Sequence, residues 1–539
     1  MIFRIRRGRV EMKQTKKKLV WADSVIMAIL TFIVLLLVNS AAWAMSAWDN
    51  VDFSTIMFQM HTPLNGTNSE IIDSFINICI SRTIQETLVI AAGYWLIKCL
   101  SRNLKFSFSL TFFNLRTKLD IGKNNRVWKW LPTIYFWGML AVYGILCYTN
   151  AKKIGFFEYL DNIREKTTIF EEQYIDPENI AIDFPEKKRN LILIYLESME
   201  STYASVEVGG GKPVNYIPHL TELAQNNINF SNGNQLGGGG NASYCGFTIG
   251  AIVGTSSGVP FKSMIEGNSM SEYAQFLPGI VTLGDILEEE GYSNYFLCGS
   301  EAEFGGRKLF YEEHGNYHIL DYNYAKEQGY TQKEKRTFWG YEDTKLFDIA
   351  KIELEKLGNS GELFNFTMLT VDTHHPSGYI CELCEEQYEH PYANAIACSD
   401  RQVVEFVSWI EAQEWYENTT VILIGDHLSM AADFWDDIGS YERKTYNCFL
   451  NLPTGLNTKN EKNRKFDTLD YFPTILASLG VRIEGERLGL GTNLFSDRKT
   501  LLEELGVEYE EELAKYSEFY IDNFEKDDMQ EDKLLKVKS

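Results

Sequence analysis

A long apolar stretch without a single charge, at residues 25–45, limits what this chain can fold into more than any other feature of its sequence. It reads VIMAILTFIVLLLVNSAAWAM, and a helix of this length crosses the roughly 30 Å hydrocarbon core of a bilayer. The stretch is longer than the apolar part of an ordinary signal peptide, and further apolar stretches follow it. We therefore expect a chain that stays anchored in a membrane instead of one that is cleaved and released.

Two further stretches are candidates for crossing the membrane. Residues 130–148 carry no charge and have aromatic residues near both ends, as is typical of spans that meet the membrane interface. Residues 84–100 contain Glu86 and Lys98, so a helix lying on the membrane surface is the alternative there. With this stretch included, residues 1–150 are expected to form a membrane region of about three helices.

Charge is distributed unevenly along the chain. Residues 1–150 carry 17 Lys and Arg against 8 Asp and Glu, whereas residues 151–539 carry 34 against 66. The bases gather before the first span and between the second and third, as in cytoplasmic loops. Three crossings then place everything after Ala151 outside the cytoplasm, which predicts a multi-pass protein of the cell membrane. The acidic exported part argues against nucleic acid as a partner.

The exported part divides by composition into three segments. Residues 151–189 are polar and interrupted by Pro177 and Pro185, so we expect a linker. Residues 190–496 are expected to be a separate domain, since 539 residues exceed what one core supports. Residues 497–539 form an acidic tail, in which LLEELGVEYEEELAKY predicts a peripheral helix and the final residues predict disorder.

Short apolar runs alternate with amphipathic stretches over the main domain. Three runs are short, rich in strand-forming residues and bounded by breakers, which favours strands buried on both faces: 190–196, 363–369 and 420–424. Four stretches have helical periodicity: 218–226, 282–290, 343–356 and 401–413. This alternation predicts an α/β domain with a central, mostly parallel sheet.

Potential metal ligands follow the ends of these three strands. Glu197 follows the first run, Asp426 and His427 follow the third, and the second run is followed by Thr370, Asp372, Thr373, His374 and His375. Ligand sites in open α/β sheets lie beyond the carboxyl ends of the strands. One such Asp alone would be explained as a helix cap and one His as a loop residue. Three strand ends together favour a divalent metal site.

A glycine-rich loop leads into a segment of small residues at 237–261, which reads GGGGNASYCGFTIGAIVGTSSGVPF. Glycines let backbone amides approach an anion, and a helix start favours negative charge. Ser243 and Thr248 are the hydroxyls at its head, and a metal could convert one of them into a nucleophile. A flexible linker before a core helix is the alternative.

Three of the nine cysteines, Cys381, Cys384 and Cys398, cluster in the exported part. Oxidation is permitted there, so we expect one disulfide that staples a loop, although spacing does not determine the pairing. A cysteine-rich zinc site is less expected, because CELC has no second CxxC and only His390 lies nearby.

Four motifs together resemble the lipoteichoic acid synthase and phosphoglycerol transferase family, in the sulfatase-like branch of the alkaline phosphatase superfamily. They are LIYLES around Glu197, CGFTIGAIVGTSSGVP around Thr248, TVDTHHP around His374 and IGDH around Asp426. The resemblance covers about residues 188–496 and includes FWGYED near Trp339. It implies a sulfatase-like domain behind a helical transmembrane region.

The resemblance also implies a function and a set of site residues. Glu197, Thr248, Asp426 and His427 would hold one divalent ion, commonly Mn²⁺ in this family, with Mg²⁺ or Zn²⁺ as alternatives. Thr248 would take glycerol phosphate from phosphatidylglycerol, release diacylglycerol, and pass the phosphoryl group to an envelope glycan or teichoic acid acceptor. His374, or else His375, would bind the phosphoryl or glycerol group. Trp339 and Tyr341 would line the head-group pocket.

Some departures from the family pattern leave alternatives open. IGAIVG after Thr248 is closer to transferases that decorate periplasmic glucans than to lipoteichoic acid polymerases, so the acceptor stays open. Cys245 lacks the CxPSR context of a sulfatase nucleophile, and no histidine follows His427, which favours a single metal. A phosphoethanolamine transferase is the alternative enzyme. A catalytically silent binding module of the envelope is the alternative of another class.

Overall fold

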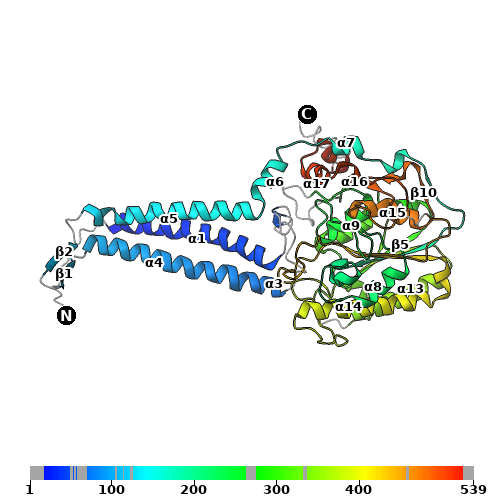
Figure 1. The fold of residues 1–539 in the computed structure, drawn as a ribbon, viewed down its shortest axis with the longest axis horizontal. Coiled ribbons are helices and arrows are strands. Elements are labelled where there is room, and N and C mark those ends of the chain that lie inside the picture. Colours follow the sequence, from blue (N-terminus) through cyan, green and yellow to red (C-terminus); the bar gives the residue numbers. More distant parts are fainter. Residues whose placement is uncertain are drawn as a thin grey trace. The chain divides into compact units, whose positions relative to one another are not determined.

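This computed structural model describes residues 17–48, 53, 56–57, 69–103, 106–112, 115–121, 126–262, 275–331, 337–456 and 460–525. The chain divides into two compact units (Figure 1). The first consists of residues 1–46 and 69–156, and the second of residues 47–68 and 157–539. The last residues of the tail, 526–539, for which the sequence predicts disorder, lie outside the described residues.

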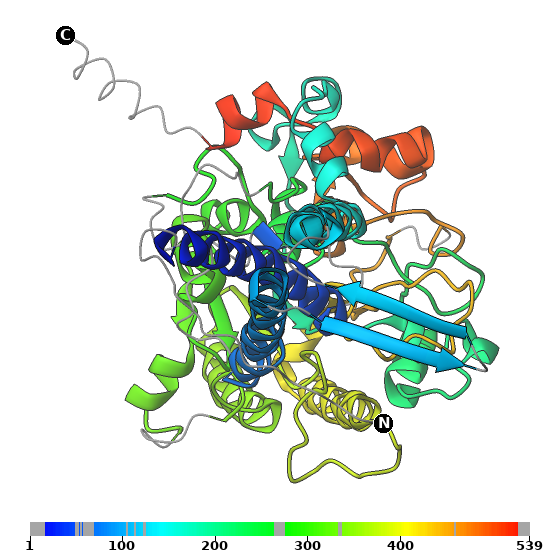
Figure 2. The same ribbon diagram turned by 90° about the vertical axis from the view of Figure 1, so that its left-hand side faces the viewer.

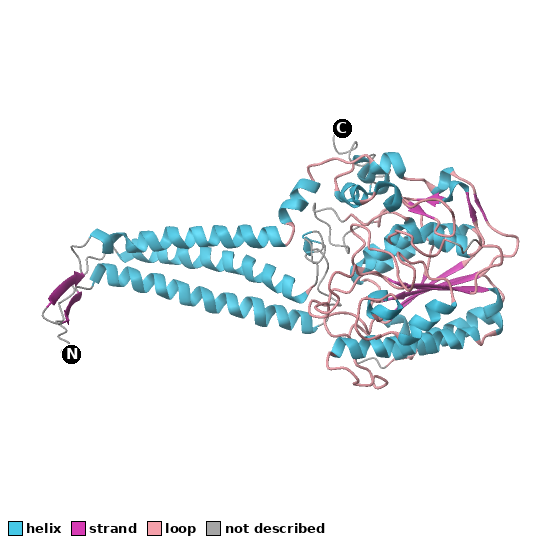
Figure 3. Cartoon of the chain, in the orientation of Figure 1, coloured by secondary structure: helices cyan, strands magenta, loops and turns pink. Residues whose placement is uncertain are grey.

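Long helices dominate the first unit (Figure 3), namely α1 (Lys17–Ala47), α4 (Ser81–Asn103) and α5 (Arg126–Lys153). A short helix, α3 (Ser69–Ser74), and a π-helical turn (Phe75–Ile80) lead into α4. Within the described residues, three stretches are long and apolar enough to cross a membrane: Ser24–Ala47, Ile72–Cys99 and Trp130–Lys153. The second stretch begins before residue 84, where the sequence analysis placed it, because FINICI continues the apolar helix toward the N-terminus.

Polar side chains between the three helices bond to one another. Tyr143 donates to Thr31 Oγ1 at 2.9 Å, joining α5 to α1. Asn39 on α1 donates to Glu86 on α4 at 3.1 Å, and Arg82 donates to the same carboxylate at 2.8 Å. A charge inside a membrane span is tolerated when such partners satisfy it. Glu86 therefore does not exclude its helix from the membrane.

A β-hairpin absent from the sequence analysis lies between the second and third spans. Strands β1 (Phe106–Phe112) and β2 (Leu115–Ile121) pair antiparallel, with Phe106 opposite Ile121, and are the two long blue arrows of Figure 2. FSFSLTF and LRTKLDI alternate apolar and polar residues with the period of two that favours a strand. The basic residues of this loop obscure that pattern.

A six-stranded sheet forms the centre of the second unit, in the order β6-β5-β7-β4-β8-β9. Its strands are β4 (Asn190–Leu196), β5 (Ser293–Cys298), β6 (His318–Leu320), β7 (Phe364–Leu369), β8 (Thr419–Gly425) and β9 (Asn447–Leu450). Leu193 of β4 lies in register with Thr367 of β7 and with Ile422 of β8. Five strands are parallel, and only the edge strand β9 runs antiparallel to its neighbour.

Helices cover both faces of this sheet, as Figure 1 shows. One face packs against α9 (Thr248–Ser257), α10 (Leu283–Glu289) and α15 (Tyr471–Ser478). The other packs against α8 (Pro218–Asn226), α13 (Asp343–Ser360) and α14 (Pro391–Glu411). Successive residues of β4 alternate between the two cores, which explains why its run NLILIYL is apolar throughout. The predicted mostly parallel α/β architecture is confirmed.

Smaller elements surround this layered core. They are α6 (Phe156–Asn162), α7 (Ile169–Gln173), β3 (Ile182–Asp183), α11 (Arg307–Glu313), α12 (Tyr322–Glu327), β10 (Arg482–Ile483), β11 (Arg487–Leu488), β12 (Gly491–Thr492), α16 (Leu501–Leu505), α17 (Val507–Ala514) and α18 (Glu518–Tyr520). Short strands pair in two ribbons, β3 with β10 and β11 with β12.

Two segments expected to be peripheral contribute to the core. Residues 151–189 are more than a linker, because Ile169 and Phe170 are buried in the same cluster as α9 and α15. The stretch LLEELGVEYEEELAKY of the acidic tail forms two helices, α16 and α17, and not one, since Gly506 breaks it with a φ of +66°. Its Leu513 is fully buried, so the expectation of a peripheral helix was wrong. The many acidic residues of α17 make its single apolar face, which contains Tyr509 and Leu513, hard to recognise in the sequence.

Candidate active site

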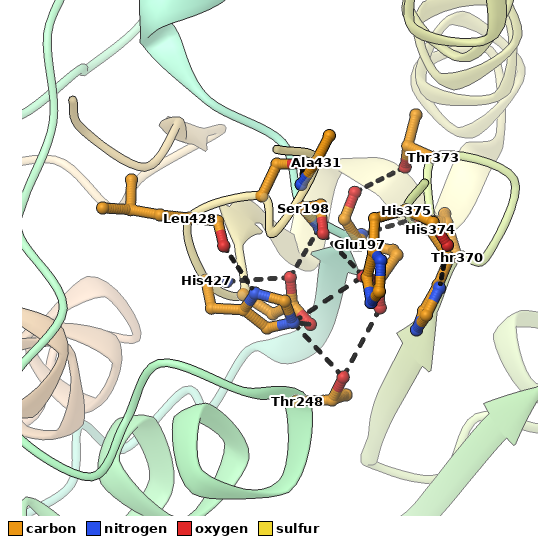
Figure 4. Close-up of polar contacts among 12 residues, drawn as sticks. Glu197, Ser198, Thr248, Thr370, Thr373, His374, His375, His427, Leu428 and Ala431 are labelled. Carbon is orange, nitrogen blue, oxygen red and sulfur yellow. Dashed lines mark hydrogen bonds and ion pairs between the residues drawn. The ribbon is translucent and has the colours of Figure 1, made fainter. Parts of the chain in front are cut away.

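Side chains from two adjacent strand ends and one helix start converge at the carboxyl edge of the sheet (Figure 4). Glu197 follows β4, and Asp426 and His427 follow its neighbour β8. Thr248 is the first residue of α9, where the glycine-rich loop ends. The structure brings together these four residues that the sequence analysis singled out.

Distances within this group match those between ligands of a single ion. Thr248 Oγ1 lies 3.5 Å from Glu197 Oε2 and 3.5 Å from His427 Nε2. His427 Nε2 lies 3.6 Å from Glu197 Oε1 and 3.5 Å from Asp426 Oδ2. These separations are long for strong hydrogen bonds. Four ligands in a tetrahedron with bonds of about 2.1 Å stand about 3.4 Å apart.

The donor atoms have the chemistry that a divalent metal requires. Among the described residues, no group donates a hydrogen bond to the buried Asp426 Oδ2. His427 Nδ1 lies 2.9 Å from the carbonyl oxygen of Leu428, so Nδ1 carries the proton and Nε2 keeps its lone pair. Glu197, Asp426 and His427 together form a buried set of oxygen and nitrogen ligands. The residues therefore fit one divalent cation.

Burial and like charge perturb this group electrostatically. Burial, reinforced by the neighbouring charge of Glu197, raises the pKa of Asp426 to about 7. Burial lowers the pKa of His427, but the carboxylates of Asp426 and Glu197 outweigh it and the net shift is upward. Such shifts show that the bare group holds excess negative charge in a buried place. A divalent cation would neutralise that charge.

Backbone and hydroxyl contacts fix the two carboxylates. The Ser198 amide donates to Asp426 Oδ1 at 2.8 Å, and the Ser198 hydroxyl donates to Glu197 Oε1 at 2.7 Å. The Glu197 amide donates to Thr370 Oγ1 at 2.9 Å, and the Thr373 hydroxyl donates to the Glu197 carbonyl oxygen. Ser198 adopts a φ of +51°, a conformation uncommon for a residue with a side chain.

His374 and His375 lie beside this group on the loop that follows β7 (Figure 4). His374 Nδ1 lies 2.8 Å from the carbonyl oxygen of His375, which leaves Nε2 as an acceptor. Burial lowers the pKa of His374 despite the opposing charge of Glu197, so the ring is neutral near pH 7. The His374 ring packs on Trp339, with centroids 4.7 Å apart. His375 Nδ1 is buried without a hydrogen-bond partner among the described residues.

Tyr341 and Ser243 form hydrogen bonds outside the group of candidate metal ligands. The Tyr341 hydroxyl donates to the carbonyl oxygen of Cys298 at 3.0 Å, and its side chain is buried in the core. The Ser243 hydroxyl donates to Glu510 of the tail at 3.0 Å. Thr248 is therefore the hydroxyl of the glycine-rich segment that meets the candidate ligands.

Arg307 is a cation near the site that the sequence analysis missed. It is 6% exposed, and its positive charge contributes to lowering the pKa of His374. Its guanidinium lies over the ring of Phe304, which in turn packs against Trp339 with centroids 5.4 Å apart. Bonds to Ser300, Glu301 and Phe304 hold it through Nε and Nη2. The available sequence signal for Arg307 was the pair of glycines directly before it. In the structure both glycines have positive φ and Arg307 begins α11.

A buried carboxyl pair connects the histidine loop to α13. The amides of Val371 and Asp372 donate to the Asp343 carboxylate at 2.8 and 3.0 Å. The Asp343 amide donates in return to Asp372 Oδ1 at 3.2 Å. Burial raises the pKa of Asp343 to about 7, and burial together with Asp343 raises that of Asp372 well above its usual range.

Comparison with known proteins matches residues 189–481 to the family model described as Sulfatase. Phosphoglycerol transferase I from Salmonella choleraesuis is 32% identical over 326 residues, which are 59% of this chain and 40% of that relative. The protein of the same name from Salmonella typhimurium has the same identity and coverage. This chain thus spans about two fifths of the length of these curated relatives.

Similar solved structures include a lipoteichoic acid synthase and a phosphoethanolamine transferase. The lipoteichoic acid synthase LtaP from Listeria monocytogenes has a TM-score of 0.44 and 19% identity, covering 59% of this chain and 79% of its own. The lipooligosaccharide phosphoethanolamine transferase EptA from Neisseria meningitidis has a TM-score of 0.45 and 14% identity, covering 85% and 86%.

The family model covers more than half of the chain, from the start of β4 to the end of α15 and beyond. Within it lie the central sheet and every candidate metal ligand. The chain belongs to the sulfatase family.

Proposed function

We propose that this protein is a membrane-anchored phosphoglycerol transferase that acts through a phosphothreonine at Thr248. The observation that carries the proposal is the position of Thr248 Oγ1, which lies 3.5 Å from both Glu197 and His427 at the start of a ten-residue helix. Identity of 32% to proteins named phosphoglycerol transferase supports the same chemistry.

Cys245 supports this choice over sulfate ester hydrolysis. Its thiol is fully buried, and burial raises its pKa well above the usual range. A buried neutral thiol is a poor nucleophile. Thr248, three residues later, is the group beside the ligands.

Glu197, Asp426 and His427, together with Thr248, would hold one divalent cation. Bound there, Mn²⁺ would lower the pKa of the threonine hydroxyl and neutralise phosphate oxygens. Mg²⁺ and Zn²⁺ are the alternative ions, because oxygen and nitrogen ligands can bind Mn²⁺, Mg²⁺ or Zn²⁺.

The first step transfers the head group of phosphatidylglycerol to the protein. Thr248 Oγ1 forms a bond to phosphorus and loses its proton, while the bond from phosphorus to the diacylglycerol oxygen breaks and that oxygen gains a proton. The backbone amides at the start of α9 face the developing negative charge. Arg307 would bind a phosphoryl oxygen, and the neutral His374 would accept a hydrogen bond from the glycerol.

The second step returns the threonine to its starting state. An acceptor hydroxyl forms the new bond to phosphorus and loses its proton, while the bond from phosphorus to Thr248 Oγ1 breaks and Oγ1 regains a proton. The product is glycerol phosphate attached to an envelope glycan or teichoic acid. Trp339 packs against His374 and would cover one side of the head group.

We infer a multi-pass arrangement with the second unit outside the cytoplasm. Three helices are long and apolar enough to cross a membrane, and bases gather in the loops assigned to the cytoplasm. Such an anchor keeps the enzyme at the surface where its lipid donor resides.

The test is release of diacylglycerol by the purified full-length chain in mixed lipid and detergent micelles. The proposal predicts release from phosphatidylglycerol with Mn²⁺, and loss of at least 1,000-fold in Thr248→Ala, as expected for removal of a nucleophile. Ser243→Ala, whose hydroxyl bonds to the tail, is the matched control and should retain activity. Release from phosphatidylethanolamine instead would favour the phosphoethanolamine transferase, and inertness toward both lipids would favour a binding module.

A further inference from the structure

Three cysteine sulfurs outside the active site converge on one point. Cys381 and Cys384 lie on the loop between β7 and α14, and Cys398 lies on α14. Cys381 Sγ is 3.5 Å from Cys384 Sγ and 3.8 Å from Cys398 Sγ. The three sulfurs all lie within 4.8 Å of one another, and Cys381 and Cys398 are buried.

These spacings match a thiolate metal centre. A tetrahedral ion with metal–sulfur bonds of about 2.3 Å holds its sulfurs about 3.8 Å apart. A disulfide requires about 2.05 Å and would use only two of the three sulfurs. In the structure all three cysteines are free thiols, and Cys381 is nearly equidistant from the other two.

Hydrogen-bond donors surround the sulfurs. The Cys381 amide donates to Cys384 Sγ at 3.2 Å. Gln402 Nε2 lies 3.4 Å from Cys398 Sγ, one helical turn along α14. The Thr344 hydroxyl, on α13, lies 3.6 Å from Cys381 Sγ and donates to Gln402 at 2.8 Å.

Arg401 adds a positive charge, because its guanidinium lies 3.9 Å from Cys398 Sγ and also donates to the carbonyl oxygen of Leu383. Donors and a cation around sulfur stabilise the thiolate form, which is the form that binds metals. A structural role for free thiols would not require such an arrangement.

We propose that Cys381, Cys384 and Cys398 bind a thiophilic divalent cation, Zn²⁺ by its chemistry, separate from the active-site metal. Binding releases the thiol protons and leaves thiolate ligands. Three ligands converge among the described residues, so water or an external ligand takes the fourth position. The cation would connect α14 to the loop between β7 and α14, which also contains His374 and His375. Zinc thus replaces the disulfide that the spacing of the cysteines suggests.

Cobalt substitution in the full-length chain tests the proposal. A cobalt–thiolate bond gives a near-ultraviolet charge-transfer band, which the carboxylate, imidazole and hydroxyl ligands of the active site cannot produce. We expect the band in the wild type, with the intensity of one thiolate-bound cobalt per chain, whether or not the active site also holds cobalt. It should disappear in Cys381→Ser and Cys398→Ser, and persist in Cys448→Ser, a buried cysteine on β9.

A second pair of variants covers the case in which those substitutions prevent folding. Cys384 is only partly buried, so Cys384→Ser should fold and lose the bound cobalt, whereas Cys384→His should keep it with an altered band. Absence of the band from the reduced wild type would overturn the proposal, as would its persistence in Cys398→Ser. A thiol count two short of nine in the unfolded, metal-free chain would assign a disulfide instead.

Discussion

Ser198 positions two candidate metal ligands at once, one through its amide and one through its hydroxyl. Residues that orient metal ligands commonly contribute 10–100-fold to metal affinity. We therefore expect Ser198→Ala to weaken Mn²⁺ binding by about 10–100-fold, measured by titration calorimetry. Ser257→Ala is the control, because the Ser257 hydroxyl donates to the carbonyl oxygen of Val253 and accepts from the amide of Val259, neither of which is a candidate ligand. Equal affinities in the two variants would show that the hydroxyl does not orient Glu197.

Asp372 should make the stability of the protein depend on pH. Its folded pKa is raised well above the reference value of 3.8, so the folded state holds the proton to higher pH than the unfolded state. Stability therefore falls as pH rises above about 4, by at most about 1.4 kcal/mol per pH unit. Asp372→Asn removes this penalty, and its thermal midpoint relative to the wild type should rise between pH 5 and pH 8. A difference between the two proteins that is constant with pH would contradict the assignment.

Arg307 shows the limit of prediction at the scale of single residues. Glu197, Asp426 and His427 could be singled out because Glu197 directly follows one buried apolar run and Asp426 and His427 come just after another. Arg307 begins a short helix, and β5, the strand that precedes it, reads SNYFLC without a continuous apolar pattern. Only the tertiary arrangement brings this cation near His374. For Tyr341, the sequence suggested a place in the head-group pocket because it lies two residues after Trp339 in the motif FWGYED. In the structure its side chain is buried in the core.

At the scale of elements, the three strands predicted from sequence, β4, β7 and β8, are all buried on both faces. β4 was predicted at its observed bounds, and β7 and β8 within a residue or two at each end, because continuous apolar runs between breakers have few alternatives. Helix α14 begins at Pro391, ten residues before the predicted start, since its first turns read PYANAIAC without strong periodicity. The tail helices were misjudged because the charges on α17 outnumber its buried residues.

Helix α17 should contribute substantially to stability, contrary to its acidic appearance. Leu513 is fully buried in the core, whereas Leu505, at the end of α16, is 38% exposed. Leu513→Ala should destabilise the protein by about 2–5 kcal/mol, the usual result of removing a buried leucine side chain. The matched substitution Leu505→Ala should change stability far less. The measurement is thermal unfolding of both variants in detergent. Equal midpoints would contradict a contribution of α17 to the stability of the core.

On the scale of the whole molecule, the number and direction of membrane crossings follow from charge. Bases precede the first span and fill the loop between the second and third, whereas the second unit is acidic. We therefore expect protease added to intact cells to digest the second unit and to leave an N-terminal epitope tag protected. Lysed cells provide the control for access to the tag. Digestion of the tag in intact cells would contradict three crossings with a cytoplasmic N-terminus.

The central claim is that Thr248 carries the transferred phosphoryl group. Mass spectrometry of the full-length protein after brief incubation with phosphatidylglycerol and Mn²⁺ tests it most directly. The account predicts a glycerol-phosphate adduct on the peptide that contains Thr248, absent from Thr248→Ala. Diacylglycerol release without this adduct, or an adduct mapped to another residue, would contradict it.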